Sequence, residues 1–249
     1  TYVQPGESAL LERFGKPVSG RDVLESGFHL KLPWPIDAVH RFRAREIQTF
    51  HIGFEHEEIG SGHQKEAPVV LWTVSHYKEE FHLLVASREP AGAATNNPAG
   101  KKAPPVNLLA VGMPVHFQIT NLTWWAYTNS DSAGLMKQVA SREVVRYLVS
   151  VDVNEIMSAA RFTAGEELRR RIQTRVDELK LGVEILFVGL QDVHPPVTVG
   201  AAYEKVVGMK QRREADILRA RAYAVGTNAM AQAEAVRRKL DASAESARR

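Results

Sequence analysis

Apolar and polar residues alternate along much of the first half of the chain, as they do in strands with one buried face. The clearest alternation covers Asn107–Ile119 and predicts a buried face made of Leu109, Val111, Met113, Val115, Phe117 and Ile119. A shorter alternation within 27–36, stiffened by prolines, predicts a strand with one apolar side formed by Phe28, Leu30, Leu32 and Trp34. A further strand is expected over Ala38–Ile47.

The spacing of apolar residues becomes helical from residue 129 onwards. We expect a first helix after a cap at Ser130, with a buried face made of Leu135, Val139, Val144 and Leu148. Asp152 with Glu155, and Thr163 with Glu166, have the spacing of capping boxes and predict a short helix followed by a longer one. The longer helix is expected to bury Leu168, Ile172, Val176 and Leu179.

The apolar run Val183–Leu190 shows no alternation and therefore predicts a strand that is buried on both faces. After Pro195 and Pro196, the segment from Val197 to Arg249 contains no proline and is rich in alanine and charged residues. This composition predicts one helix of about 50 residues, roughly 75 Å long. We refer to this helix as the rod.

Apolar residues form a stripe along the rod, at steps of three or four residues. Its members are Leu218, Ala222, Val225, Ala229, Ala233, Val236, Leu240, Ala244 and Ala247. The mean step, about 3.6 residues, predicts nearly straight rods that pack side by side through small residues and so form an oligomer. The alternative is a single helix surrounded by solvent.

Composition excludes several classes of site. The 249 residues include no cysteine, so disulfides, thiolate nucleophiles and cysteine-ligated zinc are excluded. The net charge of +3 is explained as well by a solvated surface as by an anionic partner. No run approaches 18 apolar residues, as a transmembrane helix would require. Because the chain begins at Thr1 and ends within a helix, we expect that both ends are cut from a longer protein.

Two alternatives to a structural role arise from side-chain chemistry. The first is a metal-dependent enzyme built on the histidine-rich part of residues 51–106, which holds His51, His56, His63, His76 and His82. No HExxH pair supports a metal, and no GxGxxG or GxSxG motif supports another enzyme class, so we expect neither a cofactor nor an enzyme. The second is an anion or nucleic-acid binder that uses Arg169, Arg170, Arg171 and Arg175. A solvated helix face explains these arginines more simply, and we expect no nucleic-acid partner.

Several segments together resemble one family. Gly27-Phe28-His29-Leu30-Lys31-Leu32-Pro33-Trp34-Pro35 is similar to the membrane-proximal "PGxHxxxPWP" segment of the SPFH, or band 7, proteins. Phe14-Gly15-Lys16-Pro17 resembles their "RFGK" turn, and Met113 to Ile119 takes the place of their "V-x-Y-R-I" strand. Glu184 to Pro196 and then Ala201 to Val206 resemble the strand, the proline pair and the "AFxxV" start of their coiled coil. The likeness spans nearly the whole chain and is greatest to the bacterial HflK-like members.

The resemblance implies an α+β fold: a two-lobed SPFH domain of mixed or antiparallel sheets with helices, followed by one long C-terminal helix. We assign residues 1–120 to a membrane-proximal, strand-rich lobe with an insertion at about 51–106. Residues 121–196 then form an α/β lobe and 197–249 the rod. Within the insertion, 88–105 is expected to be a surface loop that assembly does not need.

Members of this family are non-enzymatic membrane scaffolds that form large rings or cages around a membrane patch. The HflK-like members restrain an FtsH-type AAA protease. The resemblance thus implies self-association, contact with lipids and a protease partner. It also implies a place at the bacterial inner membrane, on the periplasmic side, through a transmembrane segment that this chain lacks. The apolar side of 27–36 then becomes the expected membrane contact, formed by Phe28, Leu30, Leu32, Trp34 and Ile36. The expected oligomer interface is the stripe from Leu218 to Leu240.

Overall fold

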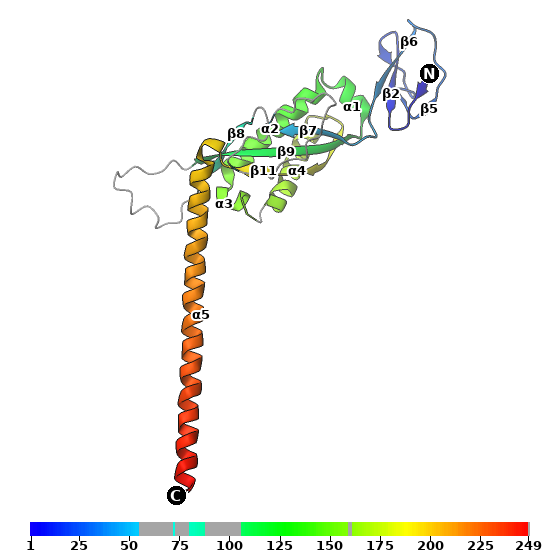
Figure 1. Cartoon of the computed structure of the whole chain (residues 1–249). Coiled ribbons are helices and arrows are strands. Elements are labelled where there is room, and N and C mark those ends of the chain that lie inside the picture. The colour runs from blue at the N-terminus through cyan, green and yellow to red at the C-terminus, as the bar shows by residue number, and fades with distance from the viewer. Residues whose placement is uncertain (55–71, 73–79, 88–105, 159–160, 249) are drawn as a thin grey trace, which may run out of the picture. The chain divides into compact units, whose positions relative to one another are not determined.

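The computed structural model describes residues 1–54, 72, 80–87, 106–158 and 161–248 (Figure 1). The chain divides into two units, Thr1–Val197 and Thr198–Arg249. The first unit combines antiparallel sheets with helices, and the second is a long helix, so the predicted α+β architecture is confirmed. The predicted surface loop at 88–105, and most of the predicted insertion, lie outside the described residues.

A small sheet occupies the N-terminal part of the first unit. Its central strand β2 (Ser8–Arg13) pairs with β3 (Lys16–Pro17) and β4 (Val23–Leu24) on one side and with β6 (Asp37–Phe42) on the other. A separate pair, β1 (Tyr2–Val3) and β5 (Gly27–Phe28), forms a two-stranded sheet. The core here is small and consists of Val3, Ala9, Leu11 and Leu24.

A larger antiparallel sheet is centred on β9 (Val106–Ile119), which pairs with four strands. They are β7 (Gln48–Ile52) and β8 (His82–Ala86) along one edge and β10 (Val183–Val188) and β11 (Gln191–His194) along the other. All six residues of the predicted inner face, from Leu109 to Ile119, are buried in the main core, which confirms this strand.

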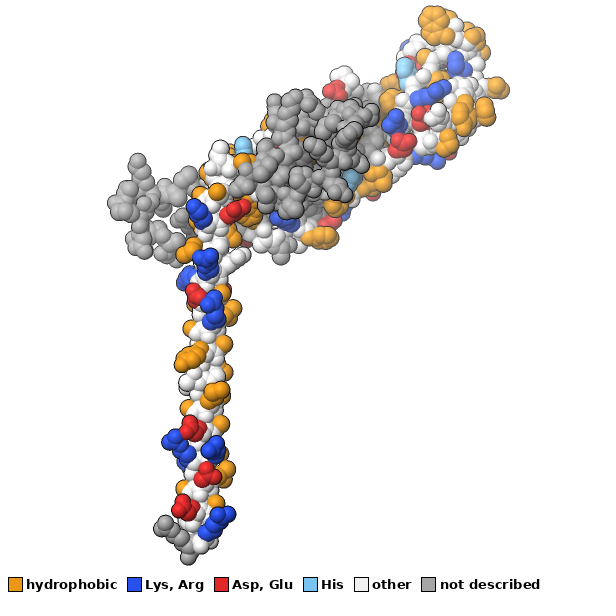
Figure 2. Space-filling view, viewed as in Figure 1, with side chains coloured by type: hydrophobic (Ala, Val, Ile, Leu, Met, Phe, Trp, Pro, Cys, Tyr) orange, Lys and Arg blue, Asp and Glu red, His pale blue; other side chains and the backbone are white. Residues whose placement is uncertain are grey.

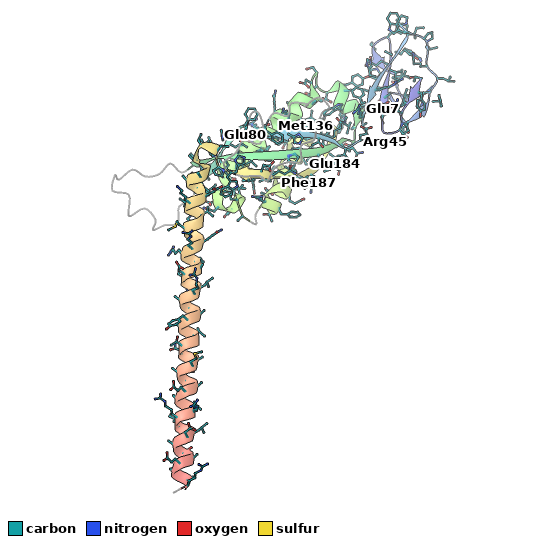
Figure 3. The ribbon with its side chains drawn as sticks, viewed as in Figure 1. Glu7, Arg45, Glu80, Met136, Glu184 and Phe187 are labelled. Atoms are coloured by element: carbon teal, nitrogen blue, oxygen red, sulfur yellow. The ribbon has the colours of Figure 1, made fainter. Side chains whose placement is uncertain are left out.

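Four helices of the described residues belong to this larger layer. They are α1 (Leu122–Tyr127), α2 (Ser132–Ser150), α3 (Val153–Ile156) and α4 (Arg161–Glu178). Helices α2 and α4 pack against each other and against the sheet, and their buried residues join those of β9 in one core (Figure 3 marks Met136 on α2). On α4, Leu168, Ile172 and Val176 are buried as predicted.

Some predicted helix details are wrong. Asp131, not Ser130, caps α2, because its carboxylate accepts from the Gly134 N–H at 2.8 Å. Thr163 lies inside α4 rather than at its start. Leu179 is 38% exposed because it follows the last residue of the helix. The cap at Asp152 is confirmed, since its carboxylate accepts from the Asn154 N–H.

Three predicted strands also differ. The run at 183–190 is not buried on both faces: Val183, Ile185 and Val188 of β10 are buried, whereas Glu184 and Phe187 are exposed (Figure 3). Phe187 is exposed although it lies two residues after the buried Ile185, because the pairing with β9 shifts register between these two residues. Helix α4 covers only one face of this strand. The strand expected over Ala38–Ile47 ends at Phe42, where its pairing with β2 ends. Of residues 27–36, only Gly27–Phe28 form a strand.

Side-chain hydrogen bonds join the small sheet to the larger layer. The Tyr127 hydroxyl of α1 donates to Glu12 of β2 at 2.8 Å, and the Thr123 hydroxyl donates to Asp22 at 3.2 Å. The predicted boundary at residue 120 would separate β9 from β10, its sheet partner. We therefore place the change between lobes in the connection from β6 to β7 and retain the two-lobed division as a proposal.

The second unit is α5 (Val197–Arg248), a continuous helix of 52 residues. The prediction of one long helix is confirmed. From Leu218 to the last described residue, every side chain is exposed within the chain.

Candidate functional site

The end of β5 and the segment from β5 to β6 present large apolar side chains to solvent. Phe28 is 88% exposed, Leu30 90%, Trp34 81% and Leu32 43%. We call these four residues the apolar loop. Ile36, also predicted to contact the membrane, is half-buried. The possibility that this segment is an ordinary sheet strand facing a core is therefore wrong, since these side chains face away from both cores.

The apolar loop is fixed by interactions at its base. The buried Asp37 carboxylate accepts from Arg13 at 2.9 and 3.3 Å and from the Leu32 N–H at 2.8 Å. The hydrogen bonds from Arg13 and from the Leu32 backbone hold the pKa of Asp37 below its usual value. A turn closes where the Ile36 N–H donates to the Pro33 carbonyl at 3.0 Å. The backbone thus holds the apolar side chains outward without a core of their own.

Two further exposed aromatic residues adjoin the apolar loop. The Tyr2 ring lies 4.7 Å from that of Phe28, measured between centroids. Phe14 is 74% exposed, and its N–H donates to the Ile36 carbonyl at 2.9 Å. Sequence reasoning treated Phe14 only as part of a turn. The signal that marks it is a large apolar residue directly before a turn glycine, where a core position is not available.

The predicted interface residues of the rod lie on one face of α5. At about 100° per residue, the positions from Leu218 to Leu240 fall within roughly 80° of one another. The larger side chains among these residues are exposed to solvent, Leu218 to 56% and Val225 to 70%. Figure 2 shows hydrophobic side chains recurring along the rod. The structure therefore brings these residues together as one solvent-exposed apolar stripe.

The metal-enzyme alternative gains no support from the described residues. His51 lies on β7 and His82 on β8, whereas His56, His63 and His76 lie outside the described residues. Among described side chains, no group of three or more His, Cys, Asp or Glu could hold a metal ion. A cleft of about 430 Å³ between β7, β8 and α2 has one histidine, His51, among its described lining residues, and no carboxylate.

The anion-binding alternative is weakened by ion pairs on α4. Arg169 lies 3.2 Å from Glu166, and Arg170 and Arg171 lie 2.9 and 2.7 Å from Glu167. Arg175 pairs with Glu178 and lies 3.8 Å from the buried Glu143. The hydrogen bonds that Arg171 and Arg170 donate to Glu167 lower the pKa of that carboxyl. An anion would have to displace these carboxylates, so this face does not present free positive charge.

Residues 1–224 match the family described as SPFH domain / Band 7 family. The chain belongs to the band 7 family. The resemblance drawn from the proline-rich segment and the proline pair before the rod is thereby confirmed.

Individual band 7 relatives are distant. Protein HflK of Buchnera aphidicola subsp. Acyrthosiphon pisum is 22% identical over 117 residues, which are 47% of this chain and 29% of that protein. The protein named Modulator of FtsH protease HflK, from Escherichia coli K12, is 21% identical over 117 residues, 47% of this chain and 28% of its own length. The matched stretch thus spans under a third of these relatives. Among the residues that the structure describes, no helix is long and apolar enough to span a bilayer.

Proposed function

We propose that this band 7 chain is a non-enzymatic membrane scaffold that assembles into a ring or cage enclosing a membrane microdomain. The observation that carries the proposal is the pair of uncovered apolar surfaces on two different elements, the apolar loop and the stripe of α5. Uncovered surfaces of this kind are typical of sites that contact a membrane or another protein. Here the loop is assigned to lipid and the stripe to other copies of the chain.

The assignment of the apolar loop to lipid rests on its chemistry. Aromatic residues such as Phe28 and Trp34 favour the boundary between headgroups and acyl chains. Because the loop is anchored through Asp37 and Arg13, it reaches this boundary without unfolding the small sheet. Membership of the band 7 family supports the same assignment, and we place the protein at the bacterial inner membrane, on its periplasmic side, through a transmembrane segment outside this chain.

The assignment of the rod to self-association rests on its length and on its stripe. A helix of 52 residues buries little of its own surface, whereas repeated side-by-side contacts cover the stripe in every copy. Alanines in the stripe let helix axes approach closely, and Leu218, Val225, Val236 and Leu240 supply apolar area.

The proposed partner is an FtsH-type AAA protease, which the scaffold restrains. The printed name of the Escherichia coli relative, Modulator of FtsH protease HflK, supports this partner. No enzymatic step is assigned to the chain itself, and no cofactor is proposed.

The proposal is tested by electron microscopy of the full chain on lipid vesicles, with and without an FtsH-type AAA protease. The expected result is closed rings or cages on the membrane, with the protease inside them and its degradation of a membrane substrate slowed. Vesicle-bound protein that stays monomeric would overturn the scaffold. Rings that neither retain nor slow the protease would overturn the proposed partner.

A further inference from the structure

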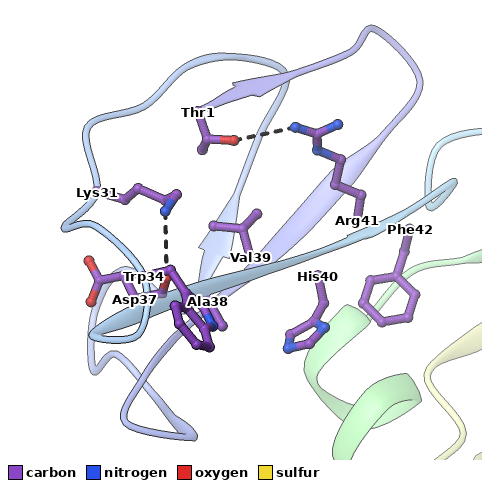
Figure 4. A pocket seen from close by; sticks show the side chains of 9 residues that line it. All are labelled: Thr1, Lys31, Trp34, Asp37, Ala38, Val39, His40, Arg41 and Phe42. Atoms are coloured by element: carbon purple, nitrogen blue, oxygen red, sulfur yellow. Dashed lines mark hydrogen bonds between the residues drawn. The ribbon is translucent and has the colours of Figure 1, made fainter.

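An open groove of about 730 Å³ runs along the outer edge of β6, at the base of the apolar loop (Figure 4). In the described part of the chain β6 pairs with β2 alone, so its other edge faces this groove. The residues lining the groove come from β6 and from the segments beside it: Thr1, Lys31, Trp34, Asp37, Ala38, Val39, His40, Arg41 and Phe42.

The strand register shows which backbone groups face the groove. The Leu11 N–H donates to Asp22, and the Leu11 carbonyl accepts from the Val18 N–H, so both groups of Leu11 point away from β6. Val39 is opposite Leu11 and therefore points its own N–H and carbonyl away from β2. Arg41, two residues further, does the same. Two backbone N–H donors thus face the groove.

Two cationic side chains add to these donors. Figure 4 shows Lys31 and Arg41 on the side of β6 that carries Val39. Lys31 donates only to backbone carbonyls, those of Leu32 at 3.2 Å and Asp37 at 3.5 Å, and Arg41 donates to the Thr1 hydroxyl at 3.4 Å. Neither cation forms a salt bridge with a described carboxylate, although the charge of Lys31 makes a small contribution to the lowered pKa of Asp37.

The nearby carboxylates are already engaged. Asp37 accepts both hydrogen bonds of Arg13 and one from the Leu32 backbone. Glu12 accepts from the Tyr127 hydroxyl and lies 3.3 Å from His40. The charges of Lys31 and Arg41 therefore remain available to a ligand, in contrast to those of the α4 arginines.

We propose that this groove binds the phosphate group of an anionic phospholipid. Ammonium, guanidinium and backbone N–H groups are the donors that bind phosphate oxygens in proteins. Trp34 belongs to both the groove and the apolar loop, so a lipid whose phosphate sits beside Arg41 has its acyl chains at the surface that the loop enters. The inference that the phosphate belongs to a lipid rests on the proposed membrane function, whereas the inference that the groove binds phosphate does not.

A β-strand from another protein fits this edge less well. An added strand would need a run of free backbone groups, but Lys31 already occupies the Asp37 carbonyl. Only Val39 and Arg41 remain, which is too short a stretch for stable strand pairing.

The first test uses Lys31→Gln with Arg41→Gln and compares vesicles of phosphatidylcholine with vesicles that also contain phosphatidylglycerol. Because each cation near an anionic surface strengthens binding about fivefold, we expect the double variant to lose roughly 25-fold on the anionic vesicles. Binding to phosphatidylcholine should not change. Lys16→Gln with Arg21→Gln is the matched control, since it removes the same charge from exposed residues outside the groove, Lys16 on β3 and Arg21 in the connection from β3 to β4. An equal loss of vesicle binding in the control would indicate general electrostatic attraction to the anionic surface and would overturn lipid binding in the groove.

The second test measures amide hydrogen exchange of the full chain at Val39 and Arg41. Soluble dihexanoyl phosphatidylglycerol should slow exchange of both amides several-fold more than inorganic phosphate at equal concentration, and the double variant should abolish the effect. Equal slowing by inorganic phosphate would show that the groove binds a free phosphate ion and would overturn the proposal that its ligand is a lipid. Slowing that grows with protein concentration and needs no ligand would indicate strand pairing between copies and overturn the proposal.

The two tests separate this inference from the proposed function. If the chain binds vesicles but the short-chain lipid does not slow exchange of these amides, the proposed scaffold stands and lipid binding in the groove is overturned. If the short-chain lipid slows exchange of both amides but the chain does not bind vesicles, lipid binding in the groove stands and the membrane scaffold is overturned.

Discussion

Trp34 provides the sharpest single test of the apolar loop. It is 81% exposed and makes no ring contact with a described residue, so Trp34→Glu removes almost no packing from the folded chain. We expect the free energy of unfolding to change by no more than about 0.5 kcal/mol, as is usual for surface substitutions. Phe28→Glu also loses the ring contact with Tyr2, which is worth about 0.5–1.5 kcal/mol, and should lower the melting temperature slightly more.

The effect on membrane binding should be much larger. Fully burying a large apolar side chain contributes about 1.5–3 kcal/mol, so losing both Phe28 and Trp34 removes roughly 3–6 kcal/mol of binding free energy. Since about 1.4 kcal/mol is a factor of ten, binding to neutral vesicles should fall at least 100-fold in the double variant. Vesicle flotation measures the binding, and calorimetry measures the melt of the same samples.

A matched control is available on α4. Phe162 is 79% exposed, close to the exposure of Phe28, but belongs to a different element. Phe162→Glu should leave vesicle binding unchanged if the apolar loop makes the contact. Equal losses for Phe28→Glu and Phe162→Glu, or a large drop in stability with binding intact, would refute the assignment.

The remaining predictions concern stability. Because the pKa of Asp37 is lowered in the folded chain, its contribution is fully present above about pH 4 and is lost as the pH falls through the lowered value. The melting temperature of Asp37→Asn should therefore depend less on pH below about 4 than that of the wild type, and parallel profiles would contradict this. Gly182→Ala should cost more than 1 kcal/mol, because Gly182 has φ +66° and an added Cβ would lie 2.3 Å from the Asn121 carbonyl oxygen. Gly20→Ala, with φ +76° and nothing within 4 Å, should cost less, and equal losses in calorimetry would show that the close approach is unimportant.

The sequence predicted best those elements whose pattern is set by a single core. The alternation in β9 and the helical spacing of Leu168, Ile172 and Val176 both follow from one buried face. The length of α5 followed from the absence of proline and the helix-forming composition. In each case the local preference and the tertiary environment agree.

The errors arose where apolar residues have no core to enter. Leu186 and Phe187 gave β10 the appearance of a doubly buried strand, although Phe187 is 44% exposed beside His116. Alternation at residues 28–34 suggested a strand, but the base of the loop is fixed by Asp37 instead of by a neighbouring strand. A hydrophobic pattern predicts where a side chain avoids water and does not identify the surface that covers it.

Some of the site could not be predicted, because it depends on contacts between residues that are far apart in the sequence. Tyr127 and Glu12 are 115 residues apart in sequence, and the edge groove exists because β6 has only one neighbour in the described sheet. Nothing in the local sequence of Lys31 or Arg41 distinguishes them from solvated cations. Their significance becomes visible only when the strand register and the partners of Asp37 and Glu12 are known.

Whether this chain assembles with itself through the rod is tested by the particle mass of a rod variant. Ala229→Glu with Ala233→Glu places bulk and like charge in the stripe of α5, where Leu218 and Val236 would each contribute about 1.5–3 kcal/mol when buried between copies. The matched control is Ala224→Glu with Ala231→Glu, which adds the same groups on the opposite face of the same exposed helix.

Light scattering gives the mass of each particle, and calorimetry follows the melt of the first unit. We expect a large wild-type particle, a control of the same mass, and a stripe variant that dissociates while its first unit melts unchanged. A stripe variant that keeps the wild-type mass would contradict assembly through the stripe, because the particle would then not depend on the rod.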